Sequence, residues 1–189
     1  NNTEKEGNKY TERMYQSSNE KLTKQQYVIT YGYKFVVCLG LLAENASAQN
    51  LIGDRGSIPK LSKLLNTLKA KGDDTPKTVR WCCLSLINII HENPPNKREF
   101  VIQSGVTHLT DILKIHASCE EVFHSALALL LIIISVDPHT KMNLANVRQN
   151  CLSYGIFDIL NEGKKKHVNN AEIHKMTKLV LDLLISDWS

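Results

Sequence analysis

The sequence contains no hydrophobic run long enough to cross a membrane. The longest run, from Ala126 to Ile134, has nine residues, whereas a membrane-spanning helix needs about 20. This run therefore predicts a helix that is buried in a protein core, and we expect no membrane partner. The chain has 189 residues, which is enough for one domain with a sizeable core.

The sequence also lacks a CxxC pair. An adjacent pair such as Cys82 and Cys83 suits neither a common disulfide nor a zinc site. This pattern is typical of reduced cysteines that act as small buried hydrophobes. Because disulfides are rare in reducing compartments, it favours a cytoplasmic protein, with the nucleus as the alternative. The five cysteines are Cys38, Cys82, Cys83, Cys119 and Cys151.

Charge of one sign is only in small excess. The chain has 23 Lys and Arg against 19 Asp and Glu, for a net charge of +4 and a pI of about 8.7. No expected helix carries the basic stripe that is typical of nucleic-acid-binding proteins, so we do not expect a nucleic-acid partner. The densest basic run, Lys164–Lys166, predicts a solvated loop rather than a phosphate or lipid site.

The residue patterns that catalysis requires are missing as well. His91-Glu92 lacks the second histidine of a zinc-protease helix, and Gly53–Gly56 lacks the Gly-Lys-Ser/Thr ending of a phosphate loop. The other histidines are scattered, without an acidic partner at ligand spacing. We therefore expect no enzyme activity, no cofactor, no metal ion and no small-molecule substrate.

What is present is helical periodicity. From Tyr27 onward, apolar residues recur at spacings of three and four, and no stretch alternates with a period of two, so the expected class is all-α. Residues 1–26 are polar and predict a flank or a marginal helix, which leaves 27–189 as the folded domain. Helix starts are expected at Thr75-Pro76, at Ser118 with Glu121, and at Asn169 with Glu172.

One unit recurs along this domain. Asn96–Leu109 matches Asn146–Ile159 at an offset of 50 residues, and Ile58–Leu65 matches Val106–Leu113 at an offset of 48. Each unit predicts a short helix, a sharp turn at a glycine such as Gly105, a second helix, a loop and a third helix. Since one unit cannot cover its own apolar face, the recurrence predicts an α-solenoid in which neighbouring units stack.

The repeated residues resemble those of armadillo repeats. Gly56–Leu65, GSIPKLSKLL, is similar to the Gly-x-Ile-Pro segment of that family, and Ser85–Ile90, SLINII, is similar to its third helix. The resemblance covers roughly Tyr27–Asp187. It implies a right-handed α-solenoid with about three full armadillo-like units plus partial flanking helices. The units of this chain are longer than the family's repeat of about 42 residues, with extra length in Lys69–Thr75 and Pro138–Ala145.

The resemblance also implies a binding mode. In armadillo proteins the third helices line a concave groove, and an asparagine on each third helix pins the main chain of a bound peptide, because a carboxamide both donates and accepts hydrogen bonds. Asn88 matches that asparagine. The neighbours that would share its face are Leu84 and Glu92, with Trp81 and Arg80 one turn further back.

The other units depart from this asparagine pattern. Aligning Val79 with Val122 puts Leu131, rather than an asparagine, at the Asn88 position, with Leu127 and His124 before it. The groove is therefore expected to be apolar, and apolar strips of this kind bind partners such as an amphipathic helix or a peptide of another protein. The expected strip comprises Val37, Leu41, Leu84, Leu127 and Leu131.

Each of these assignments has an alternative. Asn88 is a peptide clamp or a hydrogen-bonding residue within the stack, Trp81 is a binding platform or core, and Leu127 and Leu131 line the groove or belong to the core. For the whole domain, we expect a protein–protein interaction module or scaffold. The alternative is a structural or regulatory module, whose apolar groove is covered by another part of a longer chain or by a second copy in a homodimer.

Overall fold

The computed structural model describes residues 24–69, 75–135 and 144–186, with side chains except those of residues 24–31 and 144. Across these residues the chain forms ten helices and no strand, which confirms the predicted all-α class. Most of the predicted polar flank and most of the two predicted length insertions lie outside the described residues.

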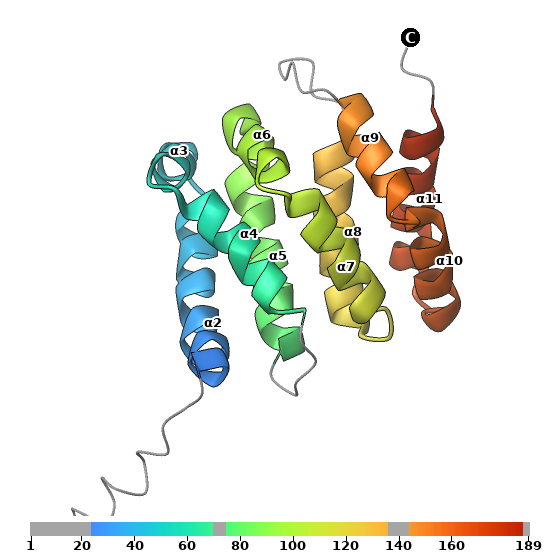
Figure 1. Cartoon of the computed structure of the whole chain (residues 1–189), viewed down its shortest axis with the longest axis horizontal. Helices are drawn as coiled ribbons and strands as arrows, with labels where there is room; N and C mark the ends of the chain where they lie inside the picture. Colours follow the sequence, from blue (N-terminus) through green and yellow to red (C-terminus); the bar gives the residue numbers. More distant parts are fainter. Residues whose placement is uncertain (1–23, 70–74, 136–143, 187–189) are drawn as a thin grey trace, which may run out of the picture.

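The helices form three consecutive triplets after a first long helix. Equivalent helices pack on one another: α2, α5, α8 and α11 make contact in that order, and so do α4, α7 and α10. Figure 1 shows the first set as one row, the second set as another row in front of it, and α3, α6 and α9 towards one end. The bounds are α2 (Lys24–Leu42), α3 (Ala46–Asp54), α4 (Ser57–Thr67), α5 (Thr75–Ile90), α6 (Pro94–Ile102), α7 (Gly105–Ile115), α8 (Glu120–Ile134), α9 (Leu144–Ser153), α10 (Ile156–Lys166) and α11 (Ala171–Ile185).

Asparagines cap several of these helices. The Oδ1 atom of Asn93 accepts a hydrogen bond from the backbone N–H of Asn96 at 3.1 Å, and Asn170 caps α11 in the same way. The start predicted at Asn169 is thus one residue early. The cap predicted at Ser118 is wrong, because the residue at the N-cap of α8 is Cys119, which makes no side-chain cap hydrogen bond.

A left-handed residue separates the first and second helices of each triplet. Gly56, Ser104 and Gly155 have φ values of 68°, 59° and 69°. The turn predicted at Gly105 therefore lies one residue earlier, at Ser104. Gly105 serves a different purpose, because a Cβ atom there would overlap the ring of Phe100.

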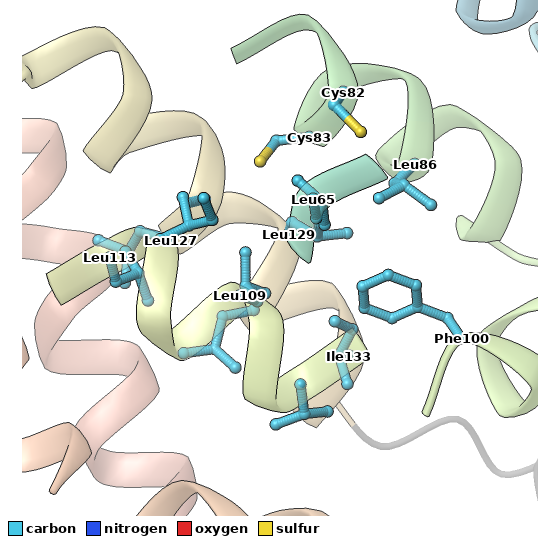
Figure 2. Close-up of a cluster of buried hydrophobic side chains, with 14 of the residues drawn as sticks. Leu65, Cys82, Cys83, Leu86, Phe100, Leu109, Leu113, Leu127, Leu129 and Ile133 are labelled. Atoms are coloured by element: carbon cyan, nitrogen blue, oxygen red, sulfur yellow. The ribbon is translucent and has the colours of Figure 1, made fainter. Parts of the chain in front are cut away.

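The core is one continuous cluster that runs through all three triplets. Phe100 and Phe123 are its largest fully buried side chains. Figure 2 shows the part of the core where leucines of α4, α5, α7 and α8 meet the ring of Phe100 and the two adjacent cysteines. Burial of Cys82, Cys83 and Cys151 confirms that they act as small hydrophobes, whereas Cys38 is exposed and Cys119 is half-buried.

Polar side chains join α2 and the triplets to one another by bonding to main-chain carbonyls. The Ser85 hydroxyl donates to the carbonyl of Val36 at 2.7 Å, and the Ser62 hydroxyl donates to that of Gln103 at 2.7 Å. The amide of buried Asn96 donates to the carbonyls of Gln49 and Ile89, both at 3.0 Å. These bonds satisfy buried backbone acceptors at the junctions, so they help to set the register of one triplet on the next.

Replacing Asn96 with alanine should therefore destabilise the fold. The change leaves the carbonyls of Gln49 and Ile89 without this donor, at an expected cost of about 1–3 kcal/mol in the free energy of unfolding. Urea denaturation followed by circular dichroism measures the loss. Asn66→Ala, at an exposed position of α4, is the matched control and should stay within about 0.5 kcal/mol of the original chain. Equal effects of the two substitutions would contradict this account of the junctions.

Gly163 offers a second test of the packing. A Cβ atom at this position of α10 would overlap the ring of Phe123, which is fully buried. Gly163→Ala should cost about 1–3 kcal/mol through overpacking, measured as a lower melting temperature. Combining it with Phe123→Leu, which makes room, should cost less than the sum of the two single changes. Strict additivity would show that the two residues do not compete for space.

Candidate protein-interaction face

The predicted alignment of the third helices is one residue out of register. Helices α5 and α8 end at Ile90 and Ile134, 44 residues apart. At this offset, fully buried Val79 and Cys82 match fully buried Phe123 and Ala126. The sequence-based alignment of Val79 with Val122 is thus one residue short, and one residue corresponds to a rotation of about 100° around a helix.

This shift corrects the assignment of Leu127. Its side chain is 0% exposed and takes the place of buried Cys83 in the preceding triplet. Figure 2 shows Leu127 within the buried cluster. The alternative that places it in the core is therefore the right one, and its assignment to a partner-binding groove is wrong. Leu131 matches Ile87 rather than Asn88, and both are half-buried against the core.

Other residues take the partly exposed positions of Asn88 and Leu84 along α8, and like Leu131 they also pack against the core. At the corrected register, Ile132 lies where Asn88 lies in α5, and Ala128 lies where Leu84 lies. Leu84, Ala128 and Ile132 are half-buried, and Leu41 of α2 is 59% exposed. We call the set Leu41, Leu84, Ala128 and Ile132 the apolar row. The sequence predicted two of its members, and the one-residue shift hid the other two.

Asn88 is tied into the stack. Its Nδ2 atom donates to the carbonyl of Gly40 at 3.1 Å, and its own carbonyl accepts a bond from Gln49 Nε2 at 2.7 Å. One amide donor of the predicted peptide clamp is therefore used within the chain. This geometry matches the structural alternative for Asn88, whose side chain is half-buried.

Trp81 and Arg80 belong to a cluster of rings and charges at the start of α5. The ring of Trp81 meets Tyr33 of α2 edge-on, with a centroid distance of 6.4 Å. The guanidinium of Arg80 lies 5.9 Å from the Trp81 ring and pairs with Glu121 of α8 at 3.4 Å. Lys77 lies over Tyr33 at 4.7 Å. Helices α2, α5 and α8 are thus joined across the end of the apolar row by contacts that stay open to solvent.

The two remaining predicted residues are His124 and Glu92. His124 takes the position of Arg80 on α8 and is half-buried. Glu92 is exposed but does not continue the face of Asn88, because α5 ends at Ile90 and Glu92 has a left-handed φ of 53°. The prediction that Glu92 follows Asn88 by one helical turn is therefore wrong.

A separate depression lies away from the predicted residues. It measures about 690 Å³ and is lined by polar side chains of α10 and α11, among them Asn161, Lys165 and His174, and by Val168 between the two helices. The run Lys164–Lys166, predicted to be a loop, forms the last turn of α10 instead. Basic residues there complement the negative end of the helix dipole. None of the predicted partner-binding residues reaches this depression.

Three buried thiols and one histidine have shifted pKa values. Burial raises the pKa of Cys83 to about 12 and that of Cys151 to about 11, and burial also raises the pKa of Cys82 well above its usual value. Desolvation, helped by the charge of Lys69 and opposed by Asp111, lowers the pKa of His108. The thiols therefore stay protonated at neutral pH, and His108 stays neutral.

The described residues contain neither a metal-binding cluster nor a membrane-spanning helix. Nowhere in 24–69, 75–135 and 144–186 do three or more His, Cys, Asp or Glu side chains gather as a metal site would require. Within these segments, no helix combines the length and the hydropathy of a membrane span.

Comparison with protein-family models, with curated proteins and with solved structures gave no match.

The thiols provide a test of the face that each helix presents. Because only the thiolate reacts with maleimides, a pKa of about 12 leaves Cys83 about one part in ten thousand reactive at pH 8. Cys38 is exposed, so it should be modified first and completely in the native chain. Mass spectrometry after timed labelling measures the order. Labelling of Cys82 or Cys83 as fast as Cys38 would contradict the burial of that side of α5, and urea should make all five react.

Proposed function

We propose that this chain is an armadillo-like, right-handed α-solenoid of about three full units that binds another protein along the apolar row. The packing of equivalent helices supports the fold, because α2, α5, α8 and α11 contact one another in order and so do α4, α7 and α10. The row itself carries the functional proposal. Apolar side chains recur at exposed or half-buried positions of α2, α5 and α8, with charged residues beside them, and such surfaces are typical of partner-binding sites.

An amphipathic helix fits this surface better than an extended peptide. An extended peptide needs a ladder of free carboxamides, whereas Asn88 donates to Gly40 and Ile132 takes the corresponding place on α8. Neighbouring helices are about 8–10 Å apart, and seven residues of a helix rise about 10.5 Å. A helix laid across the row can therefore place one apolar anchor per third helix. About 14 residues would span Leu41 to Ile132.

The cluster at one end of the row supplies orientation. Arg80, Lys77 and the ring of Trp81 offer a cation and an aromatic face to a partner, and Arg80 already pairs with exposed Glu121. An exposed ion pair contributes little to stability, so a partner carboxylate can compete for Arg80 at small cost. In this proposal, apolar burial provides the affinity and the charged cluster fixes the direction of the bound helix.

The proposal includes no catalysis, cofactor or small-molecule substrate, and it places the protein in the cytoplasm. It rests on the apolar chemistry of the row and on free thiols, one of them exposed, which suit a reducing compartment. The runner-up is a structural module whose apolar row is covered by another part of a longer chain or by a second copy. Strong binding of an apolar-surface dye by the isolated chain would favour the first function, and its absence would favour the second.

Selection of helical peptides on the purified chain tests the binding proposal. Peptides of about 14 residues, displayed in a library patterned for one apolar face, should enrich for binders of the native chain. Leu84→Asp should weaken a selected peptide at least about 10-fold, since it places a charge in the desolvated contact. Leu84 is half-buried, so circular dichroism must show an unchanged helical content. Surface plasmon resonance measures the affinity.

The matched control is Ile102→Asp, at an apolar residue of α6 that is 66% exposed and lies outside the row. It should leave the affinity within about twofold, or about 0.4 kcal/mol. If Ile102→Asp weakened the peptides as much as Leu84→Asp did, or if no helical peptide were enriched, the apolar row would not be the binding face.

A further inference from the structure

The outer edge of α2 carries a second apolar surface, separate from the apolar row. Phe35 and Leu42 are 54% and 60% exposed, and Cys38 between them is exposed too. Their spacing of three and four residues places all three on one side of the helix. We call Phe35, Cys38 and Leu42 the α2 edge.

The α2 edge points away from the contact with α5. That contact uses Val36, whose carbonyl accepts a bond from Ser85, and Gly40, where a Cβ atom would overlap the Ser85 side chain. In α5 and α8, the side turned towards the preceding third helix is covered by that helix. Among the described residues, no helix covers the corresponding side of α2. The α2 edge therefore corresponds to the helix sides that are buried at the interior junctions, but it is open to solvent.

We propose that the α2 edge pairs with the α2 edge of a second copy of this chain, antiparallel and about a two-fold axis. The spacing of the three residues makes the edge self-complementary in this orientation, because a two-fold axis beside Cys38 brings Phe35 of each copy opposite Leu42 of the other. Two-fold pairing through one shared patch is the commonest form of protein association. Cys38 of one copy then lies beside Cys38 of its partner.

Charge complementarity favours the same occupant. Lys34 and Glu44 lie just outside the α2 edge, at opposite ends, and both are exposed. In the antiparallel arrangement, Lys34 of each copy faces the end of α2 where Glu44 of the other copy lies. The pairing therefore contains two equivalent ion pairs between Lys34 and Glu44. A parallel arrangement would instead bring like charges together, which disfavours it.

The chain's own N-terminal residues suit this surface less well. Residues 1–23 are rich in Asn, Glu, Lys and Ser and offer few apolar side chains to bury. A single-helix contact also limits the area, and interfaces below about 1,200 Å² are typical of weak complexes. We therefore expect a dimer with a micromolar dissociation constant, visible at the concentrations used for light scattering.

Cross-linking through Cys38 tests the proposed arrangement of the two copies. In the full chain carrying Cys119→Ser, a short bismaleimide should give a covalent dimer through Cys38, because the three remaining cysteines are buried and protonated. Cys38→Ser should abolish the covalent dimer. Phe35→Asp should reduce it at least about 10-fold, and its exposed position should leave the helical content unchanged. Ile102→Asp, at an exposed apolar residue of α6, should leave it intact.

Charge reversal separates two-fold pairing from other contacts. Lys34→Glu should weaken the dimer, and adding Glu44→Lys to the same chain should restore it, since each copy then presents a reversed pair. A monomer in light scattering at about 100 μM, well above the micromolar dissociation constant expected for a small interface, would overturn the proposal. A dimer that Cys38 cannot cross-link would also overturn it, because the contact would then be head-to-tail or elsewhere. Failure to rescue by Glu44→Lys would contradict the antiparallel register.

Discussion

The close approach of successive third helices is the constraint on which the rest of this structure depends. Between α2 and α5 it is possible because Gly40 has no side chain where Ser85 packs, and the Ser85 hydroxyl bonds to the carbonyl of Val36. A larger residue at position 40 would separate the helices and break that bond. The same junction fixes how far α5 is rotated, and the rotation decides which side chains of α5 face the core and which face solvent.

That rotation explains why the open surface of these helices is narrow. Each third helix is buried on the side of its own triplet and on the sides that meet its neighbours, so only a thin strip remains open. Leu84, Ala128 and Ile132 lie on this strip and stay half-buried. The proposed partner helix and the proposed second copy use different surfaces of the stacked helices. The partner helix covers the open strip with the apolar row, and the second copy covers the α2 edge at the end of the stack.

The sequence predicted the helical class, the grouping of helices in threes and the burial of the run Ala126–Ile134, because periodicity and recurrence report burial. It did not predict the register between units, since Val79 and Val122 are both valines in apolar helices and only packing distinguishes an offset of 43 from one of 44. Because of this one-residue difference in offset, Leu127 lies in the core rather than in the expected groove. The bond from Asn88 to Gly40 was equally beyond the sequence, because it joins residues of different helices.

Amide chemical-shift mapping with a selected helical peptide tests the central claim most directly. The account predicts that the largest shifts in the isotope-labelled chain fall on α5 and α8 around Leu84, Ala128 and Ile132, with smaller shifts at Leu41. Saturating shifts concentrated instead on α4, α7 and α10, with the third helices unmoved, would contradict it. In that case the partner would bind the opposite row of helices, and the apolar row would serve the stability of the stack alone.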